Sequence, residues 1–294
     1  MGCHLSTSWC RNKSLDKSIE ECGNLSNKFV ELSAPHPYEN IKEIEKKILD
    51  FKNQGYEFVL HNYFPPPKKS FVLNIASEEK SVIKDCENLI TEALILSKNV
   101  NSKIYAIHAG YLSKAIAKED GMFEFDEKNN NYPKSLEQSS KFINLINKKF
   151  EDKKVKLCIE NLFPSVSRNS SLFCSLSQID DLMDRIPKNV GILLDLGHLN
   201  ISSNLLEFNR DKFLDTFLDK YGSRLYQVHI SENNGIKDEH KALEVNSWQY
   251  SVLKRINDLD VEEINYKRVY TLESRNATKE EIKENLDKIN NILI

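Results

Sequence analysis

Short apolar runs alternate with longer amphipathic segments along the whole chain. The runs have the length of a β-strand, whereas the segments between them repeat their apolar residues with the helical period. The pattern predicts strands over residues 3–8, 29–33, 57–61, 103–108, 155–162, 191–198, 224–231 and 268–273. It predicts helices over residues 15–22, 40–53, 77–98, 135–151, 176–186, 206–221, 248–259 and 279–294. Each predicted strand is therefore followed by a predicted helix.

This alternation predicts the fold class. Strands that alternate with helices form a parallel sheet, because each helix carries the chain back to the start of the next strand. Eight such units in a chain of 294 residues predict an α/β protein with a single (β/α)8 TIM barrel. No repeat or shift in composition divides the chain, so we expect one domain over residues 1–294. The polar stretch over residues 111–133 is long for a connection and predicts a lid insertion.

Six predicted strands end in a residue that can bind a metal or move a proton. These strand-end residues are His61, His108, Glu160, Asp195, His229 and Glu273. Side chains alternate along a strand, so Cys158 and Glu160 share one face while Leu157 and Ile159 share the other. Each strand-end residue is then the last inward-facing residue of its strand. Because TIM-barrel chemistry lies at the C-terminal ends of the strands, we expect the six to converge.

Composition narrows the classes of function. The net charge is −3, so no overall basic field favours nucleic acid. The longest apolar runs are strand-sized and predict no membrane span. The six cysteines form no CxxC pair, which predicts reduced thiols and a cytoplasmic protein.

Three further residues in the loops beyond the strand ends could join the centre: His198, Asp238 and His240. If these nine groups converge, their carboxylates repel one another unless cations neutralise them. Mixed histidine and carboxylate ligands suit zinc, manganese, cobalt or iron, so we expect bound divalent metal. The competing interpretation is a set of unrelated buried polar groups.

With these residues the chain resembles the xylose isomerase-like TIM barrels, which include sugar isomerases and epimerases as well as abasic-site nucleases of the endonuclease IV type. In the sugar epimerases, one divalent metal is held by residues that match Glu160, Asp195, His229 and Glu273. The pattern formed by Asp195 and His198 matches too, and the resemblance implies that His198 contacts the substrate.

The nuclease branch uses a wider ligand set for three zinc ions. Its additional ligands match His61, His108, His198, Asp238 and His240. The segment 71–76 also resembles a nuclease signature. Three departures from the nuclease pattern follow. A proline-rich insertion separates His61 from this segment, and Leu196 and Gly197 replace the residues that the nucleases tend to have. The loop over 229–240 is also shorter than the nuclease motif. These departures favour sugar chemistry and leave DNA as the partner in the alternative.

The resemblance to the epimerases implies that Glu160 and Glu273 are catalytic, one removing a carbon-bound proton and the other returning it. The expected substrate is a small sugar or sugar phosphate. Candidates for contacting it are His108, His198, Arg275, Trp9, Tyr63, Phe64 and Trp248. A third interpretation is a metal-bearing barrel that binds without turnover, against which the intact carboxylates argue. A homo-oligomer is compatible with all three interpretations.

Overall fold

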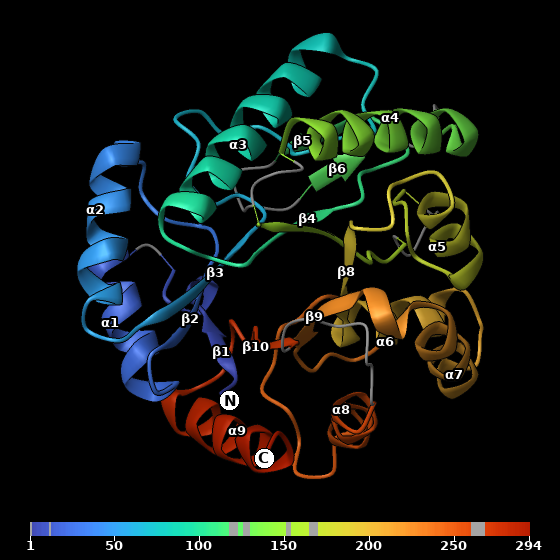
Figure 1. Cartoon of the computed structure of the whole chain (residues 1–294). Coiled ribbons are helices and arrows are strands. Elements are labelled where there is room, and N and C mark those ends of the chain that lie inside the picture. Colours follow the sequence, from blue (N-terminus) through green and yellow to red (C-terminus); the bar gives the residue numbers. More distant parts are fainter. Residues whose placement is uncertain are drawn as a thin grey trace.

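A closed barrel of parallel strands forms the centre of the computed structural model (Figure 1). The structure describes residues 2–11, 13–117, 123–125, 130–150, 154–164, 170–259 and 268–294. Around the barrel, neighbouring strands follow the order β1 (His4–Ser6), β10 (Val269–Leu272), β9 (Leu225–Ile230), β8 (Gly191–Asp195), β7 (Lys156–Glu160), β4 (Ile104–His108), β3 (Glu57–His61) and β2 (Phe29–Leu32). The predicted TIM barrel is confirmed.

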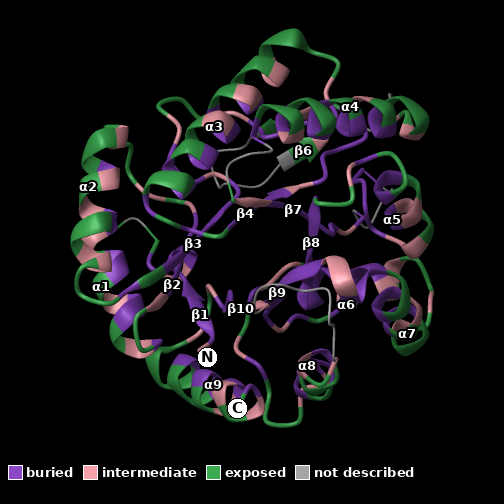
Figure 2. Ribbon diagram, in the orientation of Figure 1, coloured by how far each residue is buried: buried purple, intermediate pink, exposed green. Residues whose placement is uncertain are grey.

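Helices surround the barrel and cover the outer face of its strands (Figure 1). They are α1 (Leu15–Leu25), α2 (Ile41–Lys52), α3 (Lys80–Asn99), α4 (Tyr132–Phe150), α5 (Leu176–Met183), α6 (Leu196–Leu205), α7 (Arg210–Tyr221), α8 (Gln249–Asn257) and α9 (Lys279–Ile292). Figure 2 shows buried residues along the strands and exposed residues on the outward surfaces of the helices. Short 3-10 turns follow β1 (Thr7–Trp9) and α7 (Gly222–Arg224). Among the described residues, no helix combines the length and apolarity that a bilayer crossing requires.

The two faces of each strand pack into different clusters, as the alternation predicts. Cys158 and Leu193 belong to a small cluster inside the barrel. Leu157, Ile159 and Leu194 belong instead to the large core between barrel and helices. The inward parity of Glu160 and Asp195, two residues beyond Cys158 and Leu193, therefore follows from the observed packing.

The predicted strand over residues 191–198 is too long, because β8 ends at Asp195. Asp195 is the N-cap of α6, and its Oδ1 accepts a hydrogen bond from the His198 amide at 2.7 Å. The sequence analysis missed α6. It also began the next helix too early, since α7 starts at Arg210 behind its own N-cap, Asn209.

The insertion over residues 111–133 contains a two-stranded antiparallel hairpin of β5 (Ala115–Ala117) and β6 (Phe123–Phe125). Residues 118–122 and 126–129, which belong to the predicted lid, lie outside the described residues. A lid function for this insertion stays a prediction.

The turn after β4 depends on Gly110. Its φ of +108° lies in the region that favours glycine, and an added Cβ would lie 2.8 Å from Ala76 Cβ. Asn74 Oδ1 accepts hydrogen bonds from the amides of Tyr111 at 2.9 Å and Ala76 at 3.1 Å, which ties the two loops together. This turn places the Tyr111 hydroxyl 3.1 Å from Nδ1 of His108.

Gly110→Ala should therefore lower the free energy of unfolding by about 1–3 kcal/mol, because it adds backbone strain and a clash. Urea unfolding checks this. The matched control is Gly222→Ala, at a helical φ of −53° where the nearest atom to the new Cβ is Leu259 Cδ1 at 3.5 Å. Equal stability of Gly110→Ala and the native protein would contradict the prediction.

Candidate metal centre

All six strand-end residues lie at the same end of the barrel because its strands are parallel and in register. His108 is the register partner of Glu160, and Asp195 is the partner of His229. His61 ends β3, and Glu273 directly follows β10. Five of the six are buried, and His108 is partly exposed. The convergence that the sequence predicts is therefore observed.

A first group of ligands surrounds one oxygen of Glu160. His61 Nε2 lies 2.8 Å and His108 Nε2 lies 3.4 Å from Glu160 Oε2. Ligand atoms of these three residues lie within 4.8 Å of one another, so they could share one metal ion.

A second group surrounds Nδ1 of His229. This nitrogen lies 3.1 Å from Glu273 Oε2 and 3.8 Å from Asp195 Oδ2. Glu160 Oε1, the other oxygen of the carboxylate in the first group, lies 3.9 Å away. Glu160 therefore stands between the two groups.

A third group consists of His198, Asp238 and His240. Asp238 Oδ2 lies 2.6 Å from His240 Nε2 and 3.7 Å from His198 Nε2. Both imidazoles are oriented by backbone: His198 Nδ1 lies 2.7 Å from the carbonyl oxygen of Asn161, and His240 Nδ1 lies 2.9 Å from that of Glu273. Both Nε2 atoms are thereby directed toward Asp238.

The residues present fit a bound metal, because several ligand atoms are buried without a hydrogen bond. Within the described part of the chain, four such atoms have no hydrogen-bond partner: Asp195 Oδ2, His229 Nδ1, Asp238 Oδ1 and His240 Nε2. His229 Nδ1 and His240 Nε2 lie close to carboxylate oxygens yet lack hydrogen-bond geometry. Buried polar atoms are rarely left unpaired, so a divalent cation would supply the missing partner. The mixed nitrogen and oxygen donors suit zinc, manganese, cobalt or iron.

Charges of opposite sign balance one another in this centre. Burial opposes ionisation of Glu160, but the charge of His61, its hydrogen bond and the charge of His198 lower the pKa of Glu160. Burial likewise opposes the charge of Asp238, whose pKa is lowered by His240 and His198. Both carboxylates are therefore ionised at neutral pH.

The histidines divide into two kinds. Burial acts against protonated His198, but the carboxylates of Asp195 and Asp238 prevail and raise its pKa to about 10. Burial lowers the pKa of His108 to about 4 even though Glu160 acts in the other direction. A neutral His108 is ready to bind a cation, whereas His198 must first release a proton.

Arg275 lies beside the centre and is paired with Glu273. Its Nε donates to Glu273 Oε1 at 3.1 Å, and its side chain is 30% exposed. Contact of Arg275 with substrate stays a prediction.

The four aromatic residues that the sequence predicts beside the substrate contact other parts of the protein. Trp9 Nε1 donates to the carbonyl of Ala277 at 2.9 Å, and the Tyr63 hydroxyl accepts from the Leu73 amide at 2.6 Å. Trp248 stacks on the Arg210 guanidinium, 3.6 Å from the ring centroid. Phe64 is 0% exposed and packs in the large core, where it cannot wall an open pocket.

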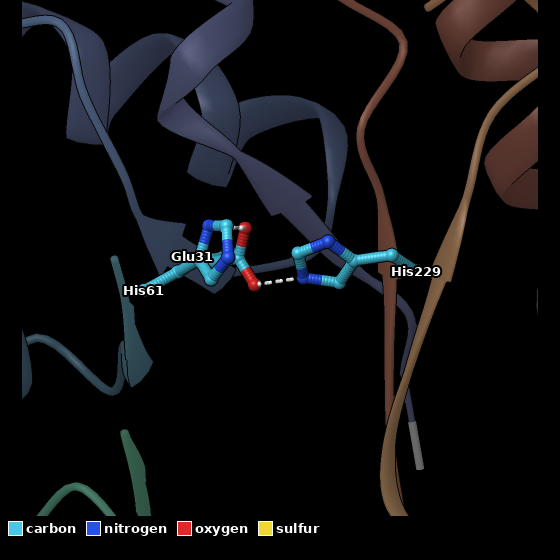
Figure 3. Close-up of side chains that lie close together, drawn as sticks. All are labelled: Glu31, His61 and His229. Carbon is cyan, nitrogen blue, oxygen red and sulfur yellow. Dashed lines mark hydrogen bonds and ion pairs between the residues drawn. The ribbon is translucent and has the colours of Figure 1, made fainter. Parts of the chain in front are cut away.

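Glu31 is a buried member of this region that the sequence analysis missed. It lies near the end of β2, and its Oε2 accepts a hydrogen bond from His229 Nε2 at 2.7 Å (Figure 3). The same oxygen accepts a second hydrogen bond from Gln227 Nε2 at 2.6 Å. Its register partner, Val59, packs inside the barrel. A single carboxylate at the inward position of an otherwise apolar strand was the signal that could have identified it.

Asn161 was also missed. Its side chain bonds the backbone of Asp195 on both sides, since Oδ1 accepts from the Asp195 amide at 2.6 Å and Nδ2 donates to the Asp195 carbonyl at 3.0 Å. Its position directly after Glu160 was the available signal. Asn161 fixes the point at which β8 passes into α6.

The chain belongs to the xylose isomerase-like TIM barrel family, whose sequence profile matches residues 20–292. An uncharacterised protein of Methanocaldococcus jannaschii is 26% identical over 223 residues, which cover 74% of this chain and 68% of the relative. A probable endonuclease 4 of Finegoldia magna is 24% identical over 254 residues, which cover 82% of this chain and 79% of the relative.

Solved structures share the fold. A D-tagatose 3-epimerase-like protein has a TM-score of 0.73 and 23% identity, covering 100% of this chain and 98% of that protein. D-Psicose 3-epimerase of Clostridium cellulolyticum, solved with D-tagatose, has a TM-score of 0.68 and 14% identity with the same coverage. A protein solved with a bound zinc atom has a TM-score of 0.67 and 12% identity, covering 99% of this chain and 96% of that one.

The raised pKa of His198 predicts how the stability of the metal-free protein depends on pH. Its pKa is about 10 in the folded protein and about 6.5 in an unfolded chain. The stabilisation is therefore complete below about pH 6.5 and is lost as pH rises through about 10. In the chelator-treated protein, this proton should contribute a fall of about 1.4 kcal/mol per pH unit to the free energy of unfolding in that window.

Urea unfolding of the native protein and of His198→Gln between pH 6.5 and 9.5 measures this contribution. The variant should show a shallower slope, because it lacks the proton of His198. Its slope should not fall to zero, since other histidines still titrate. Equal slopes would show that His198 is not protonated in the folded protein.

Proposed function

We propose that this protein is a divalent-metal-dependent isomerase or epimerase of a sugar or sugar phosphate. The observation that carries the proposal is the second ligand group: Asp195, Glu273 and Glu160 all surround one unpaired nitrogen of His229. These four residues come from four strands and match the ligand set of the sugar epimerases. The epimerases among the similar structures support the proposal through their shared barrel.

A divalent ion held by these four residues would polarise adjacent oxygens of the substrate and offset the negative charge that develops when a carbon-bound proton leaves. Glu160 and Glu273 are suited to moving that proton. Burial opposes their ionisation, but neighbouring positive charges keep the pKa of both low, His61 acting on Glu160 and Arg275 on Glu273. Both are therefore ionised, so one can accept the carbon-bound proton, and the other would return a proton that it has first taken up from solvent.

The groups at the edge of the centre would orient the substrate. His108 and His198 lie next to Glu160 and can hydrogen-bond sugar hydroxyls. Arg275, partly exposed and charged, can bind a phosphate on the substrate. Cys3, Cys10, Cys22, Cys86 and Cys158 are free thiols, which is in keeping with the reducing cytoplasm that we propose as its location.

Solvent-exchange labelling tests the proposed chemistry. The metal-loaded protein should incorporate deuterium from D2O into a ketose or ketose phosphate, detected by mass spectrometry over a panel of such sugars. Glu160→Gln should slow the exchange by roughly 10²–10⁴-fold, because it removes a proton-transfer group. The metal content of the variant is measured in parallel.

The control is Glu137→Gln, since Glu137 lies on the outer helix α4 in an exposed ion pair with Lys141. It should exchange at the native rate. Failure of the native protein to label any sugar in the panel would contradict the proposal.

The first and third ligand groups favour a second candidate, an abasic-site phosphodiesterase of the endonuclease IV type. The residues additional to the epimerase set, His61, His108, His198, Asp238 and His240, all converge on the same centre. They suit a centre of three zinc ions, and the relative from Finegoldia magna carries the name of such a nuclease. Zinc would supply an activated hydroxide and charge stabilisation for phosphodiester cleavage.

The segment after β3 argues for sugar chemistry instead. In the nucleases this region carries the residues that penetrate DNA. Here Phe64 is buried and the Tyr63 hydroxyl is bonded to the Leu73 amide, so both are committed to packing. The net charge of −3 also provides no overall attraction for phosphates.

Metal analysis separates the two candidates. Under the sugar proposal, protein purified without chelator should contain about one tightly bound divalent ion per chain by elemental analysis, and a duplex with one abasic site should stay intact at high protein concentration. Close to three zinc ions, together with chelator-sensitive cleavage of that duplex, would establish the nuclease instead.

A further inference from the structure

We infer that Glu31 is a positioning residue that determines which nitrogen atom of His229 faces the metal centre. The inference rests on the metal centre of the proposed function, and it holds for either chemistry at that centre. Glu31 belongs to none of the matched ligand positions. It lies on β2, on the barrel wall beside β3 and β1.

The contact with His229 carries the inference. Glu31 is 0% exposed, and its Oε2 accepts from His229 Nε2 at 2.7 Å (Figure 3). The Gln227 side-chain amide donates to the same oxygen at 2.6 Å. An ionised carboxylate can only accept hydrogen bonds, so this contact requires the proton of His229 to be on Nε2.

The other ring nitrogen is then left to bind a metal. Once its Nδ1 proton is released to a binding metal, His229 presents a lone pair on the side of Glu273 Oε2 and Asp195 Oδ2, while the proton on Nε2 stays bonded to Glu31. A metal-binding histidine commonly donates its second nitrogen to a carboxylate, which fixes the tautomer and the ring orientation. Glu31 occupies this position behind His229.

Glu31 lies near His61 but does not hydrogen-bond it. Its Oε1 lies 4.0 Å from His61 Nδ1 and, in the described part of the chain, is buried without a hydrogen-bond partner. The Ser33 hydroxyl lies within hydrogen-bond distance of His61 Nδ1, at 3.3 Å, while His61 Nε2 lies 2.8 Å from Glu160. The inference therefore concerns His229, whose ring packs edge to face with that of His61, with centroids 4.7 Å apart.

A purely structural role does not account for this residue. A buried carboxylate inside a barrel is costly unless it is paired, and a strand position between Val30 and Leu32 would pack well with an apolar side chain. The partner that Glu31 has is a metal ligand. The geometry therefore assigns its charge to orienting that ligand.

Zinc titration of the chelator-treated protein against a chromophoric competitor tests the inference. Glu31→Gln keeps an acceptor oxygen and loses the charge, whereas Glu31→Leu loses both. We expect Glu31→Leu to bind zinc roughly 10–100-fold more weakly than the native protein, Glu31→Gln to fall between them, and the number of ions at saturation to be unchanged. The control is Glu57→Gln, at the exposed first residue of β3, which should bind as the native protein does.

Long-range proton–nitrogen NMR of the zinc-loaded protein provides a signature that a structural role would not change. Native His229 should appear as the Nε2-protonated tautomer, and Glu31→Leu should lose that single form. Native zinc affinity and tautomer in both variants would overturn the inference. Loss of one whole ion in Glu31→Gln would overturn it as well, since Glu31 would then be a ligand itself.

If Glu31→Leu does not fold, Glu31→Gln still decides the matter through its affinity and NMR spectrum. No sugar is present in these experiments. A failure to label any sugar would therefore contradict the proposed function alone, whereas zinc binding that ignores Glu31 would contradict the inference alone.

Discussion

The concentration of charge at one buried end of the barrel is the constraint on which the rest of this protein depends. Glu160, Asp195 and His229 are at most 1% exposed. Such groups are tolerated away from water only when charges of opposite sign and hydrogen bonds compensate them. In the metal-free protein the compensation comes from protonated imidazoles, and a divalent cation can take over the same task by displacing those protons.

The barrel makes this concentration unavoidable. Parallel strands in register bring all their C-terminal ends to one rim, and the inward position at each end faces its counterparts across a closed ring. The layer beneath combines apolar side chains such as Cys158 and Leu193 with Gln227, whose side-chain amide donates to Glu31. Side chains at the rim are held by their neighbours, as when Asn161 bonds the backbone of Asp195 and the carbonyl of Glu273 orients His240.

One site with three ligand groups can serve different chemistries. Glu160 contacts His61 through one oxygen and faces the His229 group with the other, so the number of ions bound would decide which groups act together. A single ion among Glu160, Asp195, His229 and Glu273 would leave the outer histidines for a substrate. Occupation of all three groups would commit those histidines to metal. The candidate ligands alone do not separate the two proposed functions, and we propose a small substrate because the segment around Phe64 is packed into the core.

The sequence by itself determined the barrel and the inward parity of the strand-end residues, because alternation along a strand is a local property that each run displays. It also supplied the nine candidate ligands. Only the tertiary structure decided which of them share a group, that Glu31 stands behind His229, and that Phe64 is part of the core. It likewise decided that α6 follows β8 directly, where Asn161 bonds the backbone of Asp195 on both sides. These features depend on distances across the closed barrel between residues far apart in the chain, and no local pattern encodes such distances.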